Sequence, residues 1–248
     1  GAWRSGMGWH KDVSAGVART RRGTLTRAQK ALDDLEAVEA MALRSEEGRR
    51  ARDYLAQRQI GAEVIKRFGI GYAPKEPAQA IRSLRERKGY AVETLEQAGI
   101  IAQGSSSLKD RYAERIMFPL KDRDGHAVGF SGRKYLPDDP SDSKYINSPE
   151  TPLFRKSALL YNYGNARESM RRDGYLYVVE GFMDVIALFR AGIDSAVGLM
   201  GTALTKEHLA LLKESGVQIR LSLDSDDPGQ NAMRAIAPHL TRAGIVYK

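Results

Sequence analysis

Three acidic residues stand where two strand-like runs of the sequence end. Glu180 closes the apolar run 176–179, and Asp224 and Asp226 follow the run 219–223. Because alternate residues of an extended segment face the same side, Asp224 and Asp226 can point at one spot. Ligands of open parallel sheets bind beyond the carboxyl ends of the strands, so Glu180 can join the other two carboxylates there if both runs belong to one sheet.

Converging carboxylates without basic neighbours repel one another strongly unless a cation compensates their charge. A few hard oxygen ligands, with waters left in place, suit Mg²⁺ or Mn²⁺, and such sites commonly act on phosphates. A plainer interpretation stays open for each acid. A glutamate before a glycine is often only a turn residue, and the run D-S-D-D-P-G at 224–229 is itself rich in turn-forming residues.

The charge of the chain is unevenly distributed. Lys and Arg number 39 against 31 Asp and Glu, a net charge of +8. Residues 1–170 hold 30 of the basic and 22 of the acidic residues, whereas residues 171–248 hold 9 of each. A basic half favours a polyanionic partner, nucleic acid first, although surplus surface charge for solubility would give the same total.

The composition excludes several kinds of site. Without cysteine there is no disulfide framework, no thiolate nucleophile and no cysteine-based zinc or iron–sulfur site. The 4 histidines are scattered without HExxH spacing, which argues against a histidine-based zinc hydrolase, and no P-loop motif is present. With no apolar run of about 18 residues and no visible signal peptide, we expect a soluble, cytoplasmic protein without a membrane partner.

The elements that must position these acids follow a regular pattern from residue 174 onward. Strands are expected at 175–179, 194–199, 217–223 and 245–247. Helices between them are expected at 182–191, 206–214 and 230–240. Alternating strands and helices with short connections predict a parallel sheet with helices on its faces.

The first 170 residues predict a mixed architecture instead. Helices are expected at 27–43, from Ser45 onward, at 62–68, at 76–88 and at 91–98. The remaining segments are a flexible arm at 1–23, a turn at 70–74, a polar loop at 104–107, hairpin strands at 115–120 and 127–130, and a loop-rich stretch at 134–158. This last stretch is too long for a loop that only connects two elements of a compact domain, so we expect it to carry a functional surface.

Two segments of the second half resemble a known domain. Residues 178–184 (V-V-E-G-F-M-D) and 224–229 resemble the Toprim domain, which is shared by primases, topoisomerases and some nucleases. Four upstream segments look like the catalytic core of bacterial DnaG-type DNA primases: 67–74, 115–120, 129–133 and 144–151. Residues 153–156 and 160–161 continue that similarity in order, so the resemblance covers residues 45–248.

The sequence departs from the family pattern at the acidic loop. Ser225 replaces the glycine of the family's Asp-Gly-Asp, and Asp227 with Pro228 follows where a basic or small residue and an alanine are usual. The family also has a further acidic pair, a helical subdomain, a zinc-binding domain and a helicase-binding domain. The resemblance therefore implies a catalytic core that is incomplete at its C-terminal end.

The resemblance implies an α/β fold, with a Toprim-type parallel sheet flanked by helices and preceded by a basic mixed α/β subdomain. We expect an arm and leading helix at 1–44, the basic subdomain at 45–170 and the Toprim subdomain at 171–248. The implied catalytic residues and metal ligands are Glu180, Asp224 and Asp226, with Asp184 as an additional or outer ligand of Mg²⁺ (or Mn²⁺). The implied nucleotide- and template-binding residues are Arg58, Arg115, Arg133, Lys144, Asn147 and Lys156.

The function implied by the resemblance is metal-dependent synthesis of short RNA primers during replication. The implied partners are a single-stranded DNA template, ribonucleoside triphosphates, the RNA–DNA hybrid product and a replicative helicase, the last through a domain absent from this chain. Three alternatives stay open. They are another Toprim enzyme (a topoisomerase or nuclease), a non-catalytic single-stranded DNA-binding fragment, and a phosphatase with an aspartate nucleophile. None of the 11 tyrosines is singled out as a topoisomerase nucleophile, and Pro228 stands where such phosphatases usually have Thr or Val.

Overall fold

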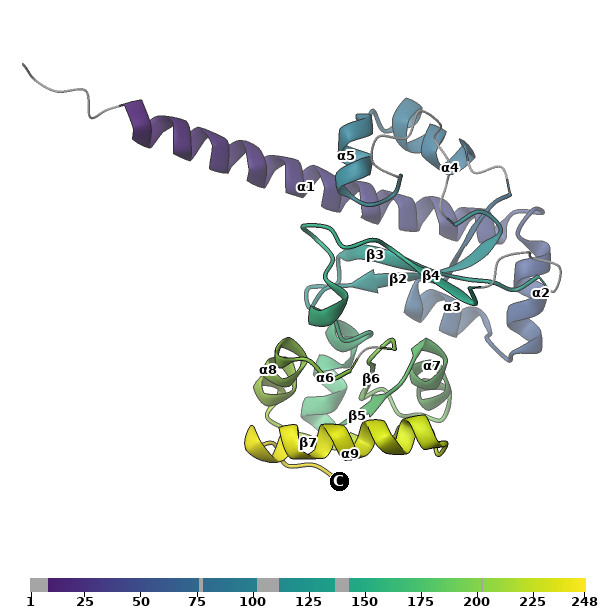
Figure 1. Ribbon diagram of the computed structural model, residues 1–248. Helices are drawn as coiled ribbons and strands as arrows, with labels where there is room; N and C mark the ends of the chain where they lie inside the picture. Colours follow the sequence, from purple (N-terminus) through teal and green to yellow (C-terminus); the bar gives the residue numbers. More distant parts are fainter. Residues whose placement is uncertain (1–8, 76–77, 102–111, 137–142, 202) are drawn as a thin grey trace, which may run out of the picture.

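The computed structural model describes residues 9–75, 78–101, 112–136, 143–201 and 203–248. Figure 1 shows two bodies, one above the other, with the C-terminus on the lower one. The upper body contains an antiparallel sheet and the first helices, and the lower body contains a parallel sheet between helices. The expected α/β fold class is confirmed. The polar loop expected at 104–107 lies outside the described residues.

Helix α1 (Trp9–Arg44) runs along the upper body, and its first half projects from it (Figure 1). Its side chains are described from Thr26 onward. Ala28, Ala31, Leu32 and Leu35 are at most 2% exposed and lie at helical spacing, so this stripe packs on the core. The helix starts at Trp9 rather than at residue 27, so the prediction of a flexible arm is wrong for residues 9–23. Isolated glycines are tolerated inside a helix that no proline interrupts.

The upper sheet has the strand order β1-β2-β3-β4 and is antiparallel throughout. The central hairpin of β2 (Arg115–Lys121) and β3 (Ala127–Arg133) confirms the sequence prediction. The two outer strands, β1 (Gly71–Ala73) and β4 (Tyr145–Asn147), were not predicted, because their segments read as a turn and a loop. Each is only three residues long and forms by pairing with the hairpin, a contact that local sequence does not encode.

Short helices pack around this sheet and α1. They are α2 (Arg49–Gln57), α3 (Ala62–Phe68), α4 (Ala78–Arg82), the π-helical turn Ser83–Arg87 and α5 (Val92–Gln97). The expected helix at 62–68 is confirmed together with its stop, since Gly69 takes a left-handed φ of 64°. The helix expected at 76–88 is divided into α4 and the π-helical turn within the described residues.

The lower sheet is parallel, with β5 (Tyr175–Val179) between β6 (Ala196–Gly198) and β7 (Gln218–Leu221). Its helices are α6 (Tyr163–Asp173), α7 (Phe182–Arg190), α8 (Lys206–Ser215) and α9 (Asp227–Arg242). Helix α6 was not predicted, and α9 starts three residues earlier than expected. The strand expected at 245–247 is present only as a bridge between Ile219 and Tyr247, with backbone hydrogen bonds to β7.

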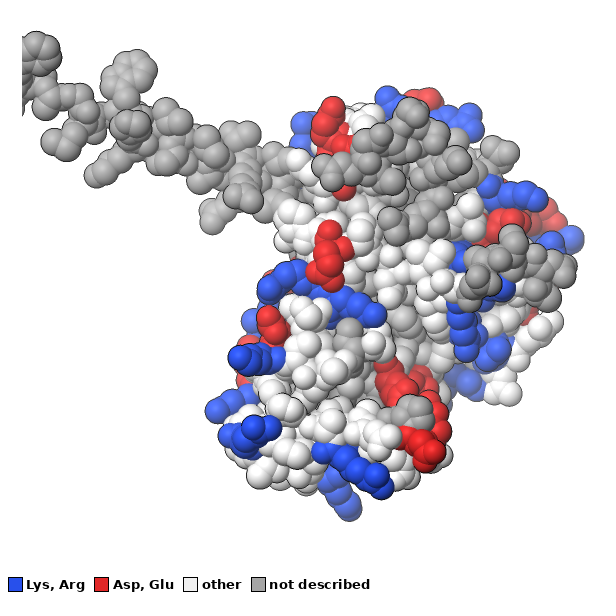
Figure 2. Space-filling view, in the orientation of Figure 1, with Lys and Arg blue, Asp and Glu red and all other residues white. Residues whose placement is uncertain are grey.

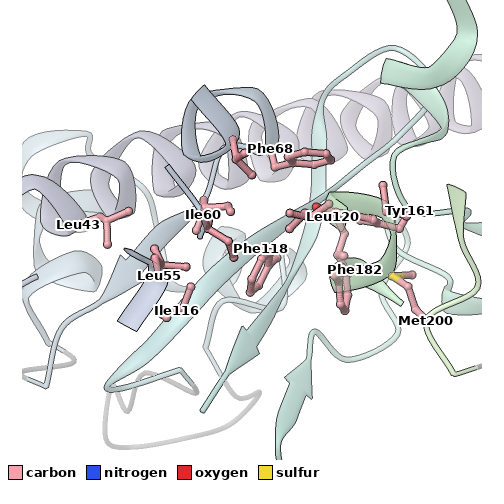
Figure 3. Close-up of a cluster of buried hydrophobic side chains, with 14 of the residues drawn as sticks. Leu43, Leu55, Ile60, Phe68, Ile116, Phe118, Leu120, Tyr161, Phe182 and Met200 are labelled. Carbon is pink, nitrogen blue, oxygen red and sulfur yellow. The ribbon is translucent and has the colours of Figure 1, made fainter. Parts of the chain in front are cut away.

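One apolar cluster joins the two bodies (Figure 3). Phe182, the first residue of α7, stacks on Phe118 of β2 with ring centroids 5.6 Å apart and meets the ring of Tyr161 edge-on at 4.6 Å. All three side chains are at most 5% exposed. The start of α7, which follows Glu180, is therefore held against the antiparallel sheet by continuous packing. Among the described helices, none combines the length and the apolar character needed to cross a membrane.

Candidate active site

A cavity of about 440 Å³ lies where the two bodies meet. From the upper body it is lined by the residue that ends α2, the end of β3, and β4 with the residue before it. From the lower body it is lined by the segments that follow β5, β6 and β7 and by the start of α7. The lining residues are Arg58, Arg133, Lys144, Tyr145, Asn147, Glu180, Gly181, Phe182, Met183, Asp184, Met200, Gly201 and Asp224. Figure 2 shows acidic side chains gathered on the lower body beside α7 and the start of α9, with basic side chains above them.

The two acidic strand ends meet in this cavity. The backbone N–H of Asp224, which follows β7, donates a hydrogen bond to Glu180 Oε1, which follows β5, at 3.1 Å. Since β5 and β7 are neighbours in the parallel sheet, both chains leave the sheet at the same edge. Glu180 is half-buried and Asp224 is exposed, so both carboxylates are accessible from the cavity.

The other two acids serve as helix caps. Asp184 Oδ2 accepts a hydrogen bond from the backbone N–H of Gly181 at 2.9 Å, which closes the first turn of α7. Asp226 Oδ1 accepts from the N–H of Gly229 at 2.9 Å and is the N-cap of α9. Asp184 still lines the cavity, whereas Asp226 does not. The turn interpretation left open by the sequence thus describes what Asp226 does in this structure.

Within the described ranges, no group of three or more His, Cys, Asp or Glu side chains is placed to hold a metal ion. The convergence of three carboxylates expected from the sequence is therefore not present in this structure. The physical reason is local: a carboxylate that caps its own helix points at backbone N–H groups rather than at its neighbours. The pair Glu180 and Asp224, with Asp184 on the same cavity wall, is what the fold brings together.

A glycine determines where the Asp224 backbone lies. A Cβ atom added to Gly229, in the first turn of α9, would lie 2.1 Å from the carbonyl oxygen of Asp224 and 3.0 Å from its nitrogen. Any side chain at this position would push the backbone of Asp224 away. Sequence reasoning identified Gly229 only as a turn residue, because its contact with a residue five positions earlier appears only once α9 has formed.

Arg133 is the basic residue most tightly held at the cavity. It is 4% exposed and lies at the end of β3. Its Nε and Nη2 donate to Tyr54 Oη at 3.1 and 2.9 Å, and its Nη1 donates to Tyr145 Oη. Burial acts to lower the pKa of Arg133, but the tyrosine contacts outweigh it and the pKa is raised. Arg133 is therefore charged at neutral pH.

The other predicted basic and polar residues divide into two groups. Arg58 and Lys144 are exposed at the cavity, and Asn147 lies beside them with its Oδ1 buried and without a hydrogen-bond partner in the described part of the chain. Arg115 and Lys156 do not line the cavity.

Arg115 and Lys156 have local partners instead. Arg115 is 3% exposed, and its Nη1 donates to the carbonyl oxygens of Gly132 and Ser143 at 3.3 and 3.2 Å, which ties the hairpin to the segment before β4. The backbone N–H of Lys156, at the start of a 3₁₀ turn (Lys156–Ala158), donates to Glu150 Oε1 at 3.0 Å.

Sequence reasoning missed the tyrosines and the apolar residues of the site. Tyr54 and Tyr145 hold Arg133, and Phe182 and Met200 line the cavity. A signal existed for the tyrosines: Tyr54 precedes Arg58 by one helical turn, and Tyr145 directly follows Lys144. Phe182 and Met200 carried no such signal, because an apolar residue near a strand end reads as core.

A parallel sheet whose strand ends carry Glu180 and Asp224 defines a Toprim-like protein, and the Toprim-like family model matches residues 177–248. The model of the DNA primase catalytic core, N-terminal domain, matches residues 39–167. The chain therefore belongs to the family of DnaG-type DNA primase catalytic cores, as the sequence resemblance implied.

Curated relatives agree with this assignment. The chain is 40% identical over 193 residues to a DNA primase of Lactococcus lactis, an alignment that covers 78% of this chain and 30% of the relative. It is 38% identical over 229 residues to a DNA primase of Staphylococcus aureus, covering 88% of this chain and 37% of the relative. The chain thus spans about a third of the length of these relatives.

Solved structures share the fold as well. The RNA polymerase domain of the Mycobacterium tuberculosis primase DnaG is 34% identical with a TM-score of 0.79, covering 86% of this chain and 71% of that one. The Aquifex aeolicus primase, in a structure of its zinc-binding and RNA polymerase domains, is 31% identical with a TM-score of 0.81, covering 90% of this chain and 54% of that one.

Proposed function

We propose that this chain is the catalytic core of a DNA primase, which synthesises short RNA primers from ribonucleoside triphosphates on single-stranded DNA. The observation that carries the proposal is the cavity itself. It places the carboxylates of Glu180 and Asp224 opposite the cationic side chains of Arg58, Arg133 and Lys144. Primer synthesis needs both charges at one place, because a triphosphate brings several negative charges that a metal ion alone does not neutralise.

A divalent cation fits the acidic side of this cavity. Glu180 and Asp224 offer hard carboxylate oxygens on neighbouring strand ends, and Asp184 lies on the same wall. So few protein ligands suit Mg²⁺ (or Mn²⁺), which keeps several waters and is completed by substrate phosphates. When bound, the ion would supply charge stabilisation to an in-line phosphoryl displacement. Asp226 is a poorer ligand because its Oδ1 caps α9.

The cationic side of the cavity is proposed to bind the nucleotide and the template. Arg133 holds a fixed charge at the end of β3, while exposed Lys144 and Arg58 can follow a bound phosphate. Asn147 lines the cavity on the same side, beside Lys144 and Tyr145. Arg115 and Lys156 support the segments around β4 rather than touching the ligand. The sequence predicted a functional surface somewhere in residues 134–158. We propose that the part of this stretch that binds the ligand is residues 144–147.

Single-stranded DNA is proposed as the template. The charge excess of residues 1–170 gives the upper body the electrostatics that nucleic acid requires. One solved relative is a DnaG primase catalytic domain bound to single-stranded DNA, 33% identical with a TM-score of 0.77. We further propose that the RNA–DNA hybrid and a replicative helicase are partners of the protein and that its location is cytoplasmic. We also propose that residues 45–170 and 171–248 form its two subdomains.

One observation favours a second candidate, a non-catalytic DNA-binding core. In the described part of the chain the acids form no group of three that could hold a metal ion. A protein of this kind would bind template and incorporate nothing. A topoisomerase gains no support, because the hydroxyl of Tyr145, which lines the cavity, accepts a hydrogen bond from Arg133.

The variant Asp224→Asn separates these candidates. Asparagine keeps the size and the turn-forming ability of aspartate but loses the ligand charge. We expect incorporation of labelled ribonucleotides on single-stranded DNA, measured in this chain and in one extending past residue 248, to fall at least about a hundredfold in the variant. Its DNA affinity should stay within about threefold, since the basic half sets it. Equal synthesis by the variant would refute the proposed metal role. Template binding without any incorporation by either parent chain would favour the second candidate.

A further inference from the structure

Tyr54 of α2 contacts two of the arginines that line the cavity but does not line the cavity itself. Its Oη accepts hydrogen bonds from Nε and Nη2 of Arg133 at 3.1 and 2.9 Å. The guanidinium carbon of Arg58 lies 5.4 Å from the centroid of the Tyr54 ring, in cation–π contact. One half-buried aromatic side chain therefore connects two like charges that belong to different elements.

The contact with Tyr54 constrains how Arg133 can turn. A guanidinium group is planar and carries its N–H donors in a rigid fork. Tyr54 Oη takes up one edge of that fork and Tyr145 Oη takes up Nη1 on the other side. Because oxygen acceptors engage both sides, the plane of the group is set, and the remaining N–H groups are left for an anion in the cavity.

Tyr54 itself is held independently of Arg133. Its neighbour Leu55 is 1% exposed in the core, which anchors this part of α2. Its ring meets the ring of Tyr135 edge-on with centroids 5.9 Å apart. Arg58 follows on the same helix face, one turn later. The hydroxyl of Tyr54 is thus presented by packing that would persist if Arg133 were changed.

We infer that Tyr54 is a positioning residue for triphosphate binding, whose hydroxyl orients Arg133 toward the cavity while its ring keeps Arg58 beside it. The inference rests on the proposed function, because the anion that the two arginines would bind is the triphosphate of a ribonucleotide. Tyr54 acts through Arg133 and does not touch the nucleotide. Loss of its hydroxyl should leave the fold intact and change only the orientation of the Arg133 guanidinium group.

The first test measures the orientation of Arg133 without any ligand. In Tyr54→Phe the ring remains and only the acceptor is lost, so the Arg133 Nε–H should exchange with water at least about tenfold faster, as followed by its side-chain NMR signal. The matched control is Tyr135→Phe, which removes a hydroxyl that bonds Tyr72 in the same aromatic cluster and should leave the signal unchanged. Equal exchange in the parent and in Tyr54→Phe would overturn the inference.

The second test measures binding of ATP with Mg²⁺ by this chain. Tyr54→Phe should weaken the affinity about tenfold, because the two hydrogen bonds that orient Arg133 are lost. In an Arg133→Met background, checked for an unchanged fold by circular dichroism, the same substitution should have no further effect. Additive losses, or tighter binding by Tyr54→Phe, would show that Tyr54 does not act through Arg133.

The two tests keep the inference separate from the proposed function. ATP binding that Arg133→Met weakens and Tyr54→Phe leaves unchanged would overturn the role of Tyr54 alone. No ATP binding by the parent chain would overturn the proposed nucleotide site, and the triphosphate part of this inference with it. The exchange rate of Arg133 decides in either case whether Tyr54 holds the guanidinium.

Discussion

Replacement of Gly229 by alanine tests how the fold positions Asp224. The added Cβ would lie 2.1 Å from the carbonyl oxygen of Asp224, whereas ordinary van der Waals contact begins at 3.4 Å. The Asp224 backbone must therefore retreat by roughly 1 Å, and a displacement of about that size at a catalytic group can cost about a hundredfold in rate. Overpacking of this kind destabilises a protein by about 2 kcal/mol, which lowers the Tm of a chain of this size by about 4–8 °C.

Three measurements check this prediction. Incorporation of ribonucleotides on single-stranded DNA should fall about a hundredfold in Gly229→Ala. The amide of Asp224 should exchange faster, because its hydrogen bond to Glu180 Oε1 is broken by the displacement. The matched control is Gly61→Ala, at a glycine with an extended backbone and no atom near the added Cβ. It should cost less than about 1 kcal/mol and leave incorporation unchanged.

The result that would refute the reasoning is a Gly229→Ala variant with the parent's Tm and the parent's rate of incorporation. A loss of stability with an unchanged Asp224 amide would also refute it, because the strain would then have been relieved by α9 rather than by the acidic strand end. In that case Gly229 would matter for the helix start and not for the position of the carboxylate.

Two further predictions concern charge. Lys144→Glu should weaken binding to single-stranded DNA more at low salt than at high salt. The reason is that exposed Lys144 lies at the cavity, and a phosphate bound there releases counterions. A salt dependence of binding equal to that of the parent chain would contradict this prediction. His208, a fully buried residue of α8, has a lowered pKa because burial disfavours its charged form. Since the unfolded chain takes up this proton more readily, stability should fall as the pH drops below about 6.5, and His208→Gln should remove this part of the decline in Tm between pH 7.5 and 5.

Much of the parallel-sheet half could be predicted from the sequence. Its strands and helices alternate, and their boundaries carry local signals such as the Thr205 cap and the Gly216 stop of α8, which hold in the structure. The meeting of Glu180 with Asp224 followed from one rule, because parallel strands of one sheet end at one edge. The family resemblance rested on short motifs and needed no coordinates.

The tertiary structure alone decided the rest of the site. Strands β1 and β4 exist only as partners of a hairpin, so local propensity did not reveal them. Tyr54 meets Arg133 across 79 positions of sequence, and only the packing of α2 on the antiparallel sheet brings them together. The hydrogen bond from the backbone N–H of Gly229 to Asp226 Oδ1 also depends on the fold, because the position of that donor is set by where α9 begins. Short-range patterns determine elements and their ends, while the direction of a side chain depends on neighbours that are distant in the chain.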